Sequence, residues 1–384
     1  RFVIGNPLRQ QPAASGKPAA EQGYRTTGIQ DLALIYQGGS HRLDWTVDEF
    51  RPYVVHRFAD GSKDWLFDGF LFLEFKDGSG RNYTVGYEKL NARRTEWEWL
   101  LDRIFEQGKS LSALDRCIGQ EIKELGKPAF RHQIVLGLPE AIRGQKDWGK
   151  LDGREMDFSK EEDQIAATKW YIGELVERFK AAKYKHLELS GFYWVAEDTH
   201  HCAELTIPLS EYIHSEGKLF YWIPYWQAKG HEEWKRLGFD VAYQQPNHFF
   251  NHSIPDSRLD EACATARRHG MAMEFEFDEK ATAAIPNSSH DRMAAYINHF
   301  EKNDVFNSSA VAYYCGNRGV LTLNESDNPK DKALMDRLAR IIQARRYLKY
   351  GIPMKNKTRV VAHRGFWHTD GSTQNSIASL LKAG

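Results

Sequence analysis

Three acidic side chains stand at alternate positions of one short β-prone segment, MAMEFEFD. Because successive side chains of a strand point to opposite faces, Glu274, Glu276 and Asp278 share one face, and the Met and Phe residues share the other. Burying such a row of carboxyl groups is costly unless they are hydrogen-bonded or perform chemistry. Glu276 is therefore a candidate catalytic residue. Glu274 is equally compatible with a structural anchor lower in the fold.

A second carboxyl group is expected from the segment HLELSGFYW and the loop that follows it. Strand alternation predicts that Leu187 faces outward, so that Glu188 and Phe192 face inward, and Glu197 lies in the loop. Paired carboxyl groups are what glycoside hydrolysis uses, because one protonates the leaving oxygen while the other attacks carbon or activates water. By analogy with many retaining glycosidases, which place carboxyl groups on two strands across the fold, Glu276 would be the nucleophile or base. Glu188 or Glu197 would be the acid, with a pKa raised by aromatic surroundings. Retaining and inverting mechanisms both stay open.

Amides, carboxyl groups and aromatic rings gather at or just beyond the ends of the β-prone segments. Amides can bind sugar hydroxyls, and aromatic faces can pack on the C–H surfaces of sugars. The residues that we expect to bind substrate are Glu74, Tyr193, Trp194, Trp222, Tyr225, Trp226, Gln244, Gln245, Asn247, Glu274, Asp278 and Tyr314. No metal-like set of His ligands and no phosphate-cradling Gly loop accompany them. We therefore expect a carbohydrate partner and neither a metal nor another cofactor.

Eight short apolar segments alternate with longer segments of helical period, and these must position the candidate residues. The strands are expected at 31–38, 67–75, 132–140, 186–194, 218–226, 240–247, 271–278 and 309–317, and helices at 97–107, 112–125, 161–182, 256–270, 290–302 and 331–351. Parallel strands need crossover helices, so eight such units, each with at least one helix, predict a closed (β/α)8 TIM barrel. Its active site would lie at the C-terminal ends of the strands. An open doubly wound sheet is the alternative, and no G-x-G-x-x-G follows the first strand to favour it.

Composition narrows the classes of protein and partner. Hydrophobic residues make up 41% and charged residues 27%, which is typical of a globular chain. Lys plus Arg and Asp plus Glu are both 52, so no net charge attracts nucleic acid or a membrane surface. No apolar run approaches the roughly 20 residues of a transmembrane segment. Four widely spaced cysteines without a C-x-x-C motif predict buried free thiols. The oligomeric state is left open.

Several motifs, in order along the chain, resemble a bacterial family catalogued as a domain of unknown function, number 4855. The motifs are DLALIYQG, WLFDGFLFLEF, ELSGFYWVAED, FYWIPYWQAKG, WKRLGFDVAYQQPNHFF and GMAMEFEFDE, and the resemblance spans about residues 25 to 350. The family is grouped with TIM-barrel glycosidase-like proteins. The resemblance therefore implies that fold and a periplasmic or cell-surface location, without implying a substrate.

The last residues resemble a different family. The motif HRG, which contains His363 and Arg364, is followed by QNS from Gln374, and this is similar to the start of a glycerophosphodiester phosphodiesterase domain. In that family the His is a catalytic acid/base, the Arg contacts phosphate and a Glu helps to hold a divalent metal. Gln374 stands where that Glu is expected, and a neutral amide is a poorer ligand for a hard cation. Metal binding is therefore in doubt even for a complete domain.

We accordingly expect a flexible arm at 1–30, a glycosidase-like barrel at 31–352, and a linker with the first strand and helix of a truncated phosphodiesterase-like domain at 353–384. No phosphodiesterase activity is expected from these 384 residues. Three functions stay open: a carbohydrate-active hydrolase, a glycan-binding barrel without catalysis, and an accessory domain of a phosphodiesterase whose catalytic domain is mostly absent.

Overall fold

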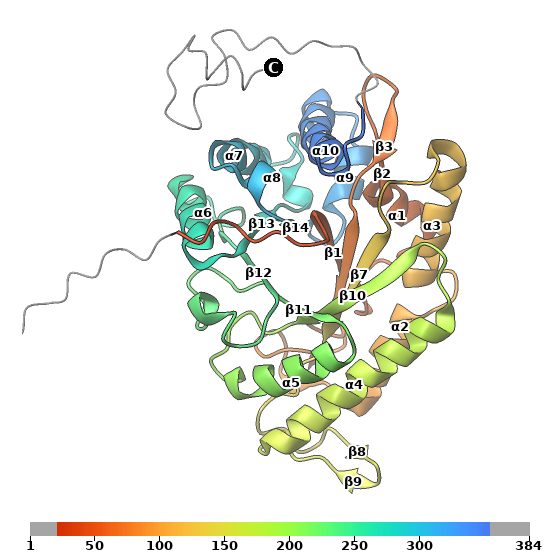
Figure 1. The fold of residues 1–384 in the computed structure, drawn as a ribbon, viewed down its shortest axis with the longest axis vertical. Helices are drawn as coiled ribbons and strands as arrows, with labels where there is room; N and C mark the ends of the chain where they lie inside the picture. Colours follow the sequence, from red (N-terminus) through yellow and green to blue (C-terminus); the bar gives the residue numbers. More distant parts are fainter. Residues whose placement is uncertain (1–20, 354–384) are drawn as a thin grey trace, which may run out of the picture. The chain divides into compact units, whose positions relative to one another are not determined.

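Eight parallel strands form a closed barrel in the computed structural model, which describes residues 21–353. The barrel strands are β1 (Asp31–Tyr36), β4 (Gly69–Leu73), β7 (His132–Leu138), β10 (Leu187–Trp194), β11 (Leu219–Trp222), β12 (Val241–Gln244), β13 (Ala272–Glu276) and β14 (Val311–Tyr314). Each pairs with the next barrel strand along the chain, and the blue β14 returns to pair with the red β1 (Figure 1). The predicted (β/α)8 barrel is confirmed, and the open sheet is excluded.

Helices surround the strands, as crossover connections between parallel strands require (Figure 1). They are α1 (Val47–Val54), α2 (Arg94–Ile104), α3 (Ser110–Leu125), α4 (Glu161–Ala182), α5 (Ala203–Ser215), α6 (Ser257–His269), α7 (His290–Lys302), α8 (Val305–Ser308), α9 (Gly319–Glu325) and α10 (Pro329–Tyr350). Between β11 and β12 the described chain holds only a 3₁₀ turn, His231–Glu233. The expectation of a helix after every strand is therefore wrong at this one position.

The connection between the first two barrel strands contains α1 and a small antiparallel pair, β2 (Val55–Arg57) with β3 (Lys63–Trp65). A capping box starts α1: the Glu49 carboxylate accepts from the Thr46 N–H at 2.7 Å, and the Thr46 hydroxyl accepts from the Glu49 N–H at 3.4 Å. The other short pairs in the described residues are β5 (Arg81–Asn82) with β6 (Leu90–Asn91) and β8 (Lys150–Leu151) with β9 (Arg154–Glu155).

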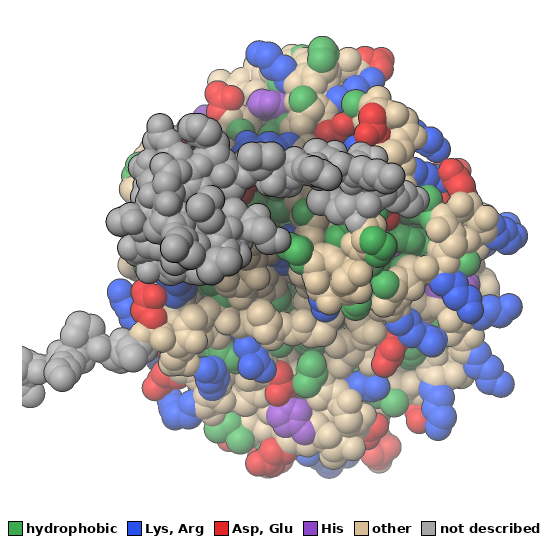
Figure 2. Space-filling view, turned by 45° about the horizontal axis from the view of Figure 1, so that its top comes forward, with side chains coloured by type: hydrophobic (Ala, Val, Ile, Leu, Met, Phe, Trp, Pro, Cys, Tyr) green, Lys and Arg blue, Asp and Glu red, His purple; other side chains and the backbone are tan. Residues whose placement is uncertain are grey.

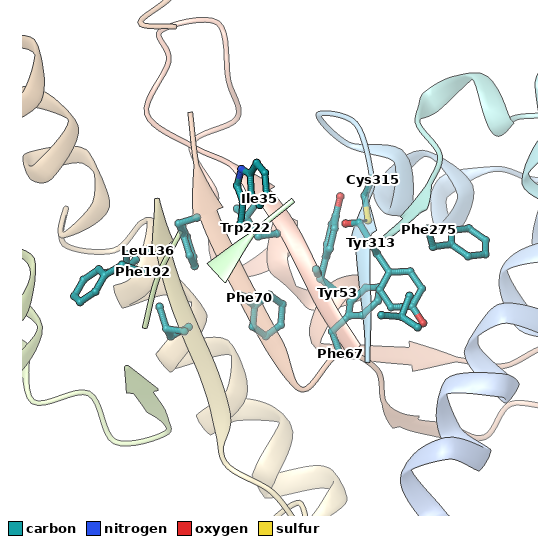
Figure 3. Close-up of a cluster of buried hydrophobic side chains, with 14 of the residues drawn as sticks. Ile35, Tyr53, Phe67, Phe70, Leu136, Phe192, Trp222, Phe275, Tyr313 and Cys315 are labelled. Carbon is teal, nitrogen blue, oxygen red and sulfur yellow. Dashed lines mark hydrogen bonds between the residues drawn. The ribbon is translucent and has the colours of Figure 1, made fainter. Parts of the chain in front are cut away.

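The largest apolar layer lies between the strands and the helices (Figure 3). Phe275 is fully buried there, with its ring centroid 5.1 Å from that of Tyr296 and 5.5 Å from that of Phe300, both on α7. Burying such a side chain contributes roughly 1.5–3 kcal/mol. The Met and Phe residues of the MAMEFEFD segment all belong to this layer. The alternation of β13 therefore turns Glu274 and Glu276 toward the barrel interior.

Strand β10 departs from simple alternation. Its register against β7 shifts between Leu189 and Gly191, which is a β-bulge. Leu189 and Phe192, although three positions apart, both pack in the outer layer, and Tyr193 joins the interior cluster. The prediction that Phe192 faces inward is wrong because the bulge reverses the alternation. A β-carbon at Gly191 would lie 2.0 Å from the Leu219 carbonyl oxygen, so the close approach of β11 requires glycine there.

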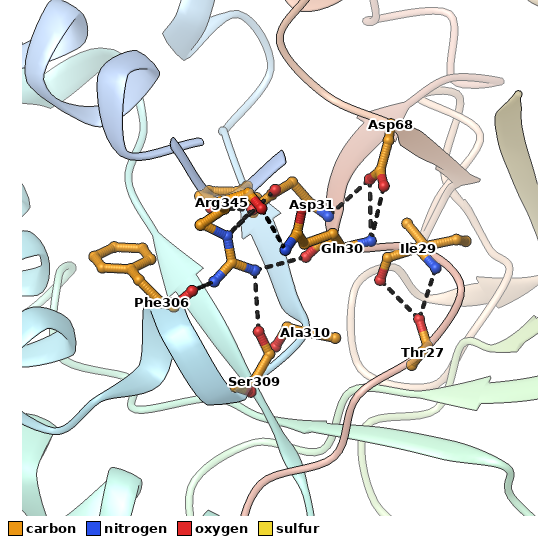
Figure 4. Close-up of polar contacts among 10 residues, drawn as sticks. Thr27, Ile29, Gln30, Asp31, Asp68, Phe306, Ser309, Ala310 and Arg345 are labelled. Atoms are coloured by element: carbon orange, nitrogen blue, oxygen red, sulfur yellow. Dashed lines mark hydrogen bonds and ion pairs between the residues drawn. The ribbon is translucent and has the colours of Figure 1, made fainter. Parts of the chain in front are cut away.

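A buried ion pair ties the N-terminal end of the barrel together (Figure 4). The Arg345 Nε donates to Asp31 Oδ1 at 3.1 Å, and the Tyr313 hydroxyl donates to the same oxygen at 2.7 Å. The remaining Arg345 N–H groups donate to the backbone carbonyls of Gln30, Phe306 and Ser309. One cation thus connects α10 with the beginnings of β1 and β14.

Residues 21–30 differ from the loose arm expected of them. The Arg25 N–H donates to the Met271 carbonyl at 2.9 Å, and the Ala310 N–H donates to the Arg25 carbonyl at 2.9 Å. The Tyr24 hydroxyl donates to the Asn303 carbonyl at 3.0 Å. This segment therefore lies against the beginnings of β13 and β14.

Surface charge is mixed, with Lys and Arg interspersed among Asp and Glu on the face shown in Figure 2. No helix within residues 21–353 is both long and apolar enough to cross a membrane. The four cysteines are buried free thiols. The chain divides into two compact units after Arg345, and the barrel strands all belong to the first.

Candidate active site

A cavity of about 380 Å³ opens where the C-terminal ends of the barrel strands meet. We call it the central cavity. Three carboxyl groups line it: Glu274 and Glu276 from β13, and Glu197 from the loop that follows β10. The end of β13 and the end of β10 thus supply acidic groups to the same space.

Glu276 is buried and surrounded by hydrogen-bond donors. Its carboxylate accepts from the backbone N–H of Asn247 at 3.2 Å, from the N–H of His248 at 3.3 Å, and from the Tyr296 hydroxyl of α7. The Asn247 side-chain amide lies 3.4 Å from the same carboxylate. Asn247 has a positive φ of 49°, in the left-handed region that asparagine tolerates. Burial raises the pKa of Glu276 to about 7, and the donors from Tyr296, His248 and Asn247 oppose that rise.

Glu274 lies one strand pleat below Glu276 and differs from it in its surroundings. No hydrogen bond from residues 21–353 reaches its carboxyl group, and its side chain is 3% exposed. Burial, followed by the nearby charges of Glu276 and Glu197, raises the pKa of Glu274 well above its ordinary value. Burial therefore favours the neutral form of Glu274, which can donate a hydrogen bond into the cavity.

Glu197 is partly buried, and burial raises its pKa to about 7. The Gln245 side-chain amide donates to its Oε1 at 2.9 Å. The Gln245 oxygen in turn accepts from the Asn247 side-chain amide at 2.9 Å. Because that amide also lies beside Glu276, Gln245 and Asn247 form a hydrogen-bonded chain between the two carboxyl groups.

Aromatic rings form a continuous path along the cavity. Tyr87 stacks on Phe75 with centroids 4.7 Å apart, and Phe75 meets Tyr36 edge-on at 5.6 Å. Tyr36 contacts Tyr314 at 5.6 Å, and Tyr314 contacts Phe250 at 5.3 Å. All five rings line the cavity. They offer apolar faces beside the carboxyl groups.

One cation on the cavity wall is held in place by a buried acid. Glu74 accepts from Arg42 through Nε and Nη2, both at 3.0 Å, in a bidentate pair. The Arg42 guanidinium lies 4.7 Å from the centroid of the Tyr36 ring. Arg42 lines the cavity, whereas Glu74 lies behind it.

Comparison with known proteins identifies the family. Residues 31–340 match the model of a family described as a domain of unknown function, DUF4855. The chain belongs to the DUF4855 family. The match ends before His363 and Arg364, which also lie outside the described residues, so the phosphodiesterase resemblance of the last residues stays a prediction.

Two solved structures that are similar to the DUF4855 barrel have low sequence identity to it. A candidate α-L-fucosidase from Bacteroides thetaiotaomicron is 14% identical with a TM-score of 0.43, and the alignment covers 89% of this chain and 99% of that one. The tryptophan synthase α-subunit from Pyrococcus furiosus is 9% identical with a TM-score of 0.38, over 84% and 99% of the two chains. These likenesses carry no argument about activity. A search of curated protein sequences found no match to this chain.

The DUF4855 barrel places one predicted acid far from the other carboxyl groups. Glu188 is exposed at the beginning of β10, where its carboxylate accepts from the Gln133 side chain at 3.3 Å. The beginnings of parallel strands lie at the opposite end of a barrel from the cavity. The sequence-based choice between Glu188 and Glu197 is corrected accordingly, and only Glu197 lines the central cavity.

Several predicted substrate-binding residues face the outer layer instead. Glu74 is in phase with the outward-facing Phe70, and Trp222 is in phase with the outward-facing Phe220. Trp194 follows the reversed alternation of β10. Trp222 stacks on Phe239 at 4.8 Å. The strand pleat therefore keeps these three side chains out of the cavity.

Four more of the predicted residues lie around the cavity without lining it. Gln244 is buried and donates to the Gln245 carbonyl at 3.0 Å, and Asp278 caps the 3₁₀ turn Glu279–Ala281 through Lys280 N–H at 2.7 Å. Trp226 packs at the edge of the outer layer. Tyr225 lines a neighbouring cavity. The predicted residues that do line the central cavity are Glu276, Glu197, Tyr193, Gln245, Asn247, Glu274 and Tyr314.

Other residues of the DUF4855 barrel line the site but were missed from the sequence. They are Leu34, Tyr36, Arg42, Phe75, Lys76, Tyr87 and Phe250. Tyr36 ends β1 and could have been found by the strand-end rule that gave Tyr314. Arg42 and Tyr87 come from connecting segments, and Tyr296 comes from α7, for which the sequence offered no signal. No group of three or more His, Cys, Asp or Glu within residues 21–353 is arranged to hold a metal ion.

Proposed function

We propose that the DUF4855 barrel is a glycoside hydrolase that uses Glu197 and Glu276. The observation that carries the proposal is a pair of carboxyl groups, each with a pKa of about 7, beside one cavity lined with aromatic rings. At neutral pH such a pair contains one group able to give a proton and one able to act as a base or nucleophile. These are the two groups that glycosidic bond cleavage requires.

The surroundings of the two carboxyl groups support different roles. Glu276 receives hydrogen bonds from two backbone N–H groups and the Tyr296 hydroxyl, and these favour its ionised form. Glu197 receives one, from Gln245, on Oε1 only. We assign Glu276 as the nucleophile or base and Glu197 as the acid.

The proposed reaction moves one proton and breaks one C–O bond. Glu197 donates its proton to the glycosidic oxygen as the bond from that oxygen to the anomeric carbon breaks. Glu276 either attacks the anomeric carbon, to be displaced by water later, or takes a proton from the water that attacks it. The neutral form of Glu274, which burial favours, and the amide of Asn247 are donors for sugar hydroxyls. The aromatic rings are faces for sugar C–H groups.

The test is hydrolysis of a panel that contains 4-nitrophenyl glycosides, labelled oligosaccharides and soluble polysaccharides. The proposal predicts cleavage of at least one member. It also predicts that Glu276→Gln lowers kcat by about 10²–10⁴-fold, while its melting temperature at neutral pH stays the same or rises. Proton NMR of the first product formed would give its anomeric configuration. A wild-type protein that cleaves no member but is stabilised against heat by one of them would instead be a glycan-binding barrel.

A further inference from the structure

Two smaller cavities adjoin the central cavity. One, of about 280 Å³, is lined by Thr84, Val85, Glu140, Asp198, His201 and Tyr225, among others, and we call it the Glu140 cavity. The other, of about 350 Å³, is lined by Phe249, His252, Lys280, Asn287 and Ser289, together with Phe250, and we call it the Lys280 cavity.

Shared residues give the order of the three cavities. Tyr87 and Glu197 line both the central cavity and the Glu140 cavity. Phe250 lines both the central cavity and the Lys280 cavity. No residue lines both the Glu140 cavity and the Lys280 cavity within the part of the chain that the structure describes. The central cavity therefore adjoins both of the others and stands between them in the order of shared residues, and we call this series the row of cavities.

The aromatic path of the site runs along this row. It begins at Tyr87, beside the Glu140 cavity, and ends at Phe250, beside the Lys280 cavity, with every ring in contact with the next. Tyr87 is 43% exposed and Phe250 is 50% exposed. Val85 and Tyr225, which line the Glu140 cavity, are 49% and 38% exposed. Large apolar side chains gathered in one exposed place mark a binding surface.

Both outer cavities also contain polar groups that are open to a ligand. In the Glu140 cavity, the buried Glu140 accepts from the Thr84 hydroxyl at 2.7 Å and the Val85 N–H at 3.2 Å through Oε2, while its Oε1 makes no hydrogen bond with a described residue. In the Lys280 cavity, the ammonium of Lys280 and the side-chain amide of Asn287 have no hydrogen-bond partner within residues 21–353. Sugar hydroxyls are suitable partners for all three groups.

The position of Glu197 fixes where a chain of sugars would be cut. A general acid must reach the oxygen that joins two sugar units. Glu197 lines both the central and the Glu140 cavity, whereas Glu276 lines the central cavity and not the Glu140 cavity. The attacked unit therefore belongs in the central cavity, and the leaving unit in the Glu140 cavity.

We propose that this site binds a linear glycan through at least three consecutive sugar units, one in each cavity, and cuts it internally between the central and Glu140 cavities. The position of the cut rests on the proposed function. The binding of three sugar units rests on the row of cavities and on the aromatic rings that run along it. The unit in the Lys280 cavity stays attached to the one in the central cavity. The fragment carrying the new reducing end is thus two units or longer.

Chain-length dependence tests the proposal. The probes are reducing-end-labelled oligosaccharides of two to six units from cellulose, xylan, mannan, chitin and starch, incubated with the 384-residue protein. We expect kcat/KM to rise about 10-fold or more from two units to three, because binding energy from a remote unit lowers the barrier at the bond that reacts. We also expect the fragment from the unlabelled side to be a disaccharide or longer. Equal kcat/KM for two and three units, with release of single sugars from that end, would overturn the proposal.

Two variants assign the third unit to the Lys280 cavity. Phe250→Ala and Lys280→Ala should each reduce the ratio of kcat/KM for three units over two. The matched controls are Ile207→Ala, an apolar residue 44% exposed on α5, and Lys180→Ala, exposed on α4, which should leave the ratio unchanged. A ratio that stays the same in both cavity variants would remove the Lys280 cavity from the binding site.

Binding measurements separate the two proposals. If no probe is cleaved, calorimetric titration with the same oligosaccharides decides the matter. Tighter binding of three units than of two, lost in Phe250→Ala, would keep the row of subsites and reject hydrolysis. Binding that does not depend on chain length, or no binding at all, would reject the row of subsites.

Discussion

Glu197 and Glu276 are joined by two amide side chains, although they belong to the ends of strands that β11 and β12 separate. The Gln245 amide donates to Glu197 at 2.9 Å, and the Asn247 amide donates to the Gln245 oxygen at 2.9 Å while lying 3.4 Å from Glu276. Both amides follow β12, which lies beside β13 in the barrel. The loop after β12 therefore helps to set how the two carboxyl groups face the cavity.

Replacing either carboxyl group by its amide should remove hydrolysis and preserve the fold. We expect Glu276→Gln and Glu197→Gln each to lower kcat by about 10²–10⁴-fold, because an amide can neither give nor take the proton. The matched control is Glu188→Gln, at the exposed beginning of β10, with activity within twofold of wild type. A loss in Glu188→Gln equal to that in Glu197→Gln would contradict the assignment.

The rate should peak near neutral pH. Glu276 must be ionised and Glu197 protonated, and burial raises the pKa of both to about 7. The rate therefore rises as Glu276 ionises and falls as Glu197 loses its proton, which gives a bell-shaped dependence of kcat/KM on pH. Initial rates from pH 4 to pH 10 would measure it. A maximum near pH 4 to 5, as for ordinary carboxyl groups, would contradict the raised pKa values.

Tyr296 acts on Glu276 without lining the cavity. Its hydroxyl donates to the carboxylate and favours the ionised form. We expect Tyr296→Phe to raise the pKa of Glu276 further and to move the acidic limb of the pH profile upward by about one unit, with a smaller effect on the alkaline limb. The melting curve at the pH of the assay is the control, because a purely structural role would lower stability and leave the limbs in place.

Stability should depend on pH through Glu274. Below its ordinary pKa of 4.5 the carboxyl group is protonated in both the folded and the unfolded chain. As the pH rises, the unfolded chain loses this proton first, because burial raises the pKa in the folded state, and the free energy of unfolding falls. Glutamine cannot ionise, so Glu274→Gln should be more stable than wild type at pH 8 and similar to it at pH 4. Urea titrations at both pH values would measure this difference, and equal effects at both would refute it.

The Arg345–Asp31 pair should be important for the closed barrel. Removing one partner leaves a buried charge without compensation, so Arg345→Met should lower the free energy of unfolding by about 3–5 kcal/mol. Arg337 of the same helix pairs with Glu301 at 2.8 Å on the surface, and Arg337→Met should cost less than about 1 kcal/mol. Denaturant titration of both variants gives the comparison. If both variants lowered the free energy of unfolding by similar amounts, the buried pair would not be what stabilises the closed barrel.

The sequence was sufficient for the barrel itself, because each strand carries a short apolar run and each expected helix carries the longer period. The count of eight strand–helix units predicted a closed sheet, and in a closed sheet β14 pairs with β1. It was also sufficient for β13, whose regular alternation correctly turned Glu274 and Glu276 inward. A regular strand has only two faces, so once the apolar face packs against the helices, the acidic face must turn toward the barrel interior.

The choice between Glu188 and Glu197 needed the tertiary structure. The bulge in β10 reverses its alternation. A bulge adds a single residue to a strand, and the order of apolar and polar residues in the sequence does not reveal it. Glu188 also begins its strand, whereas the site lies where strands end. The contribution of Tyr296 and the row of three cavities needed the structure for a different reason: they join segments distant in sequence, which only the closure of the barrel brings into contact.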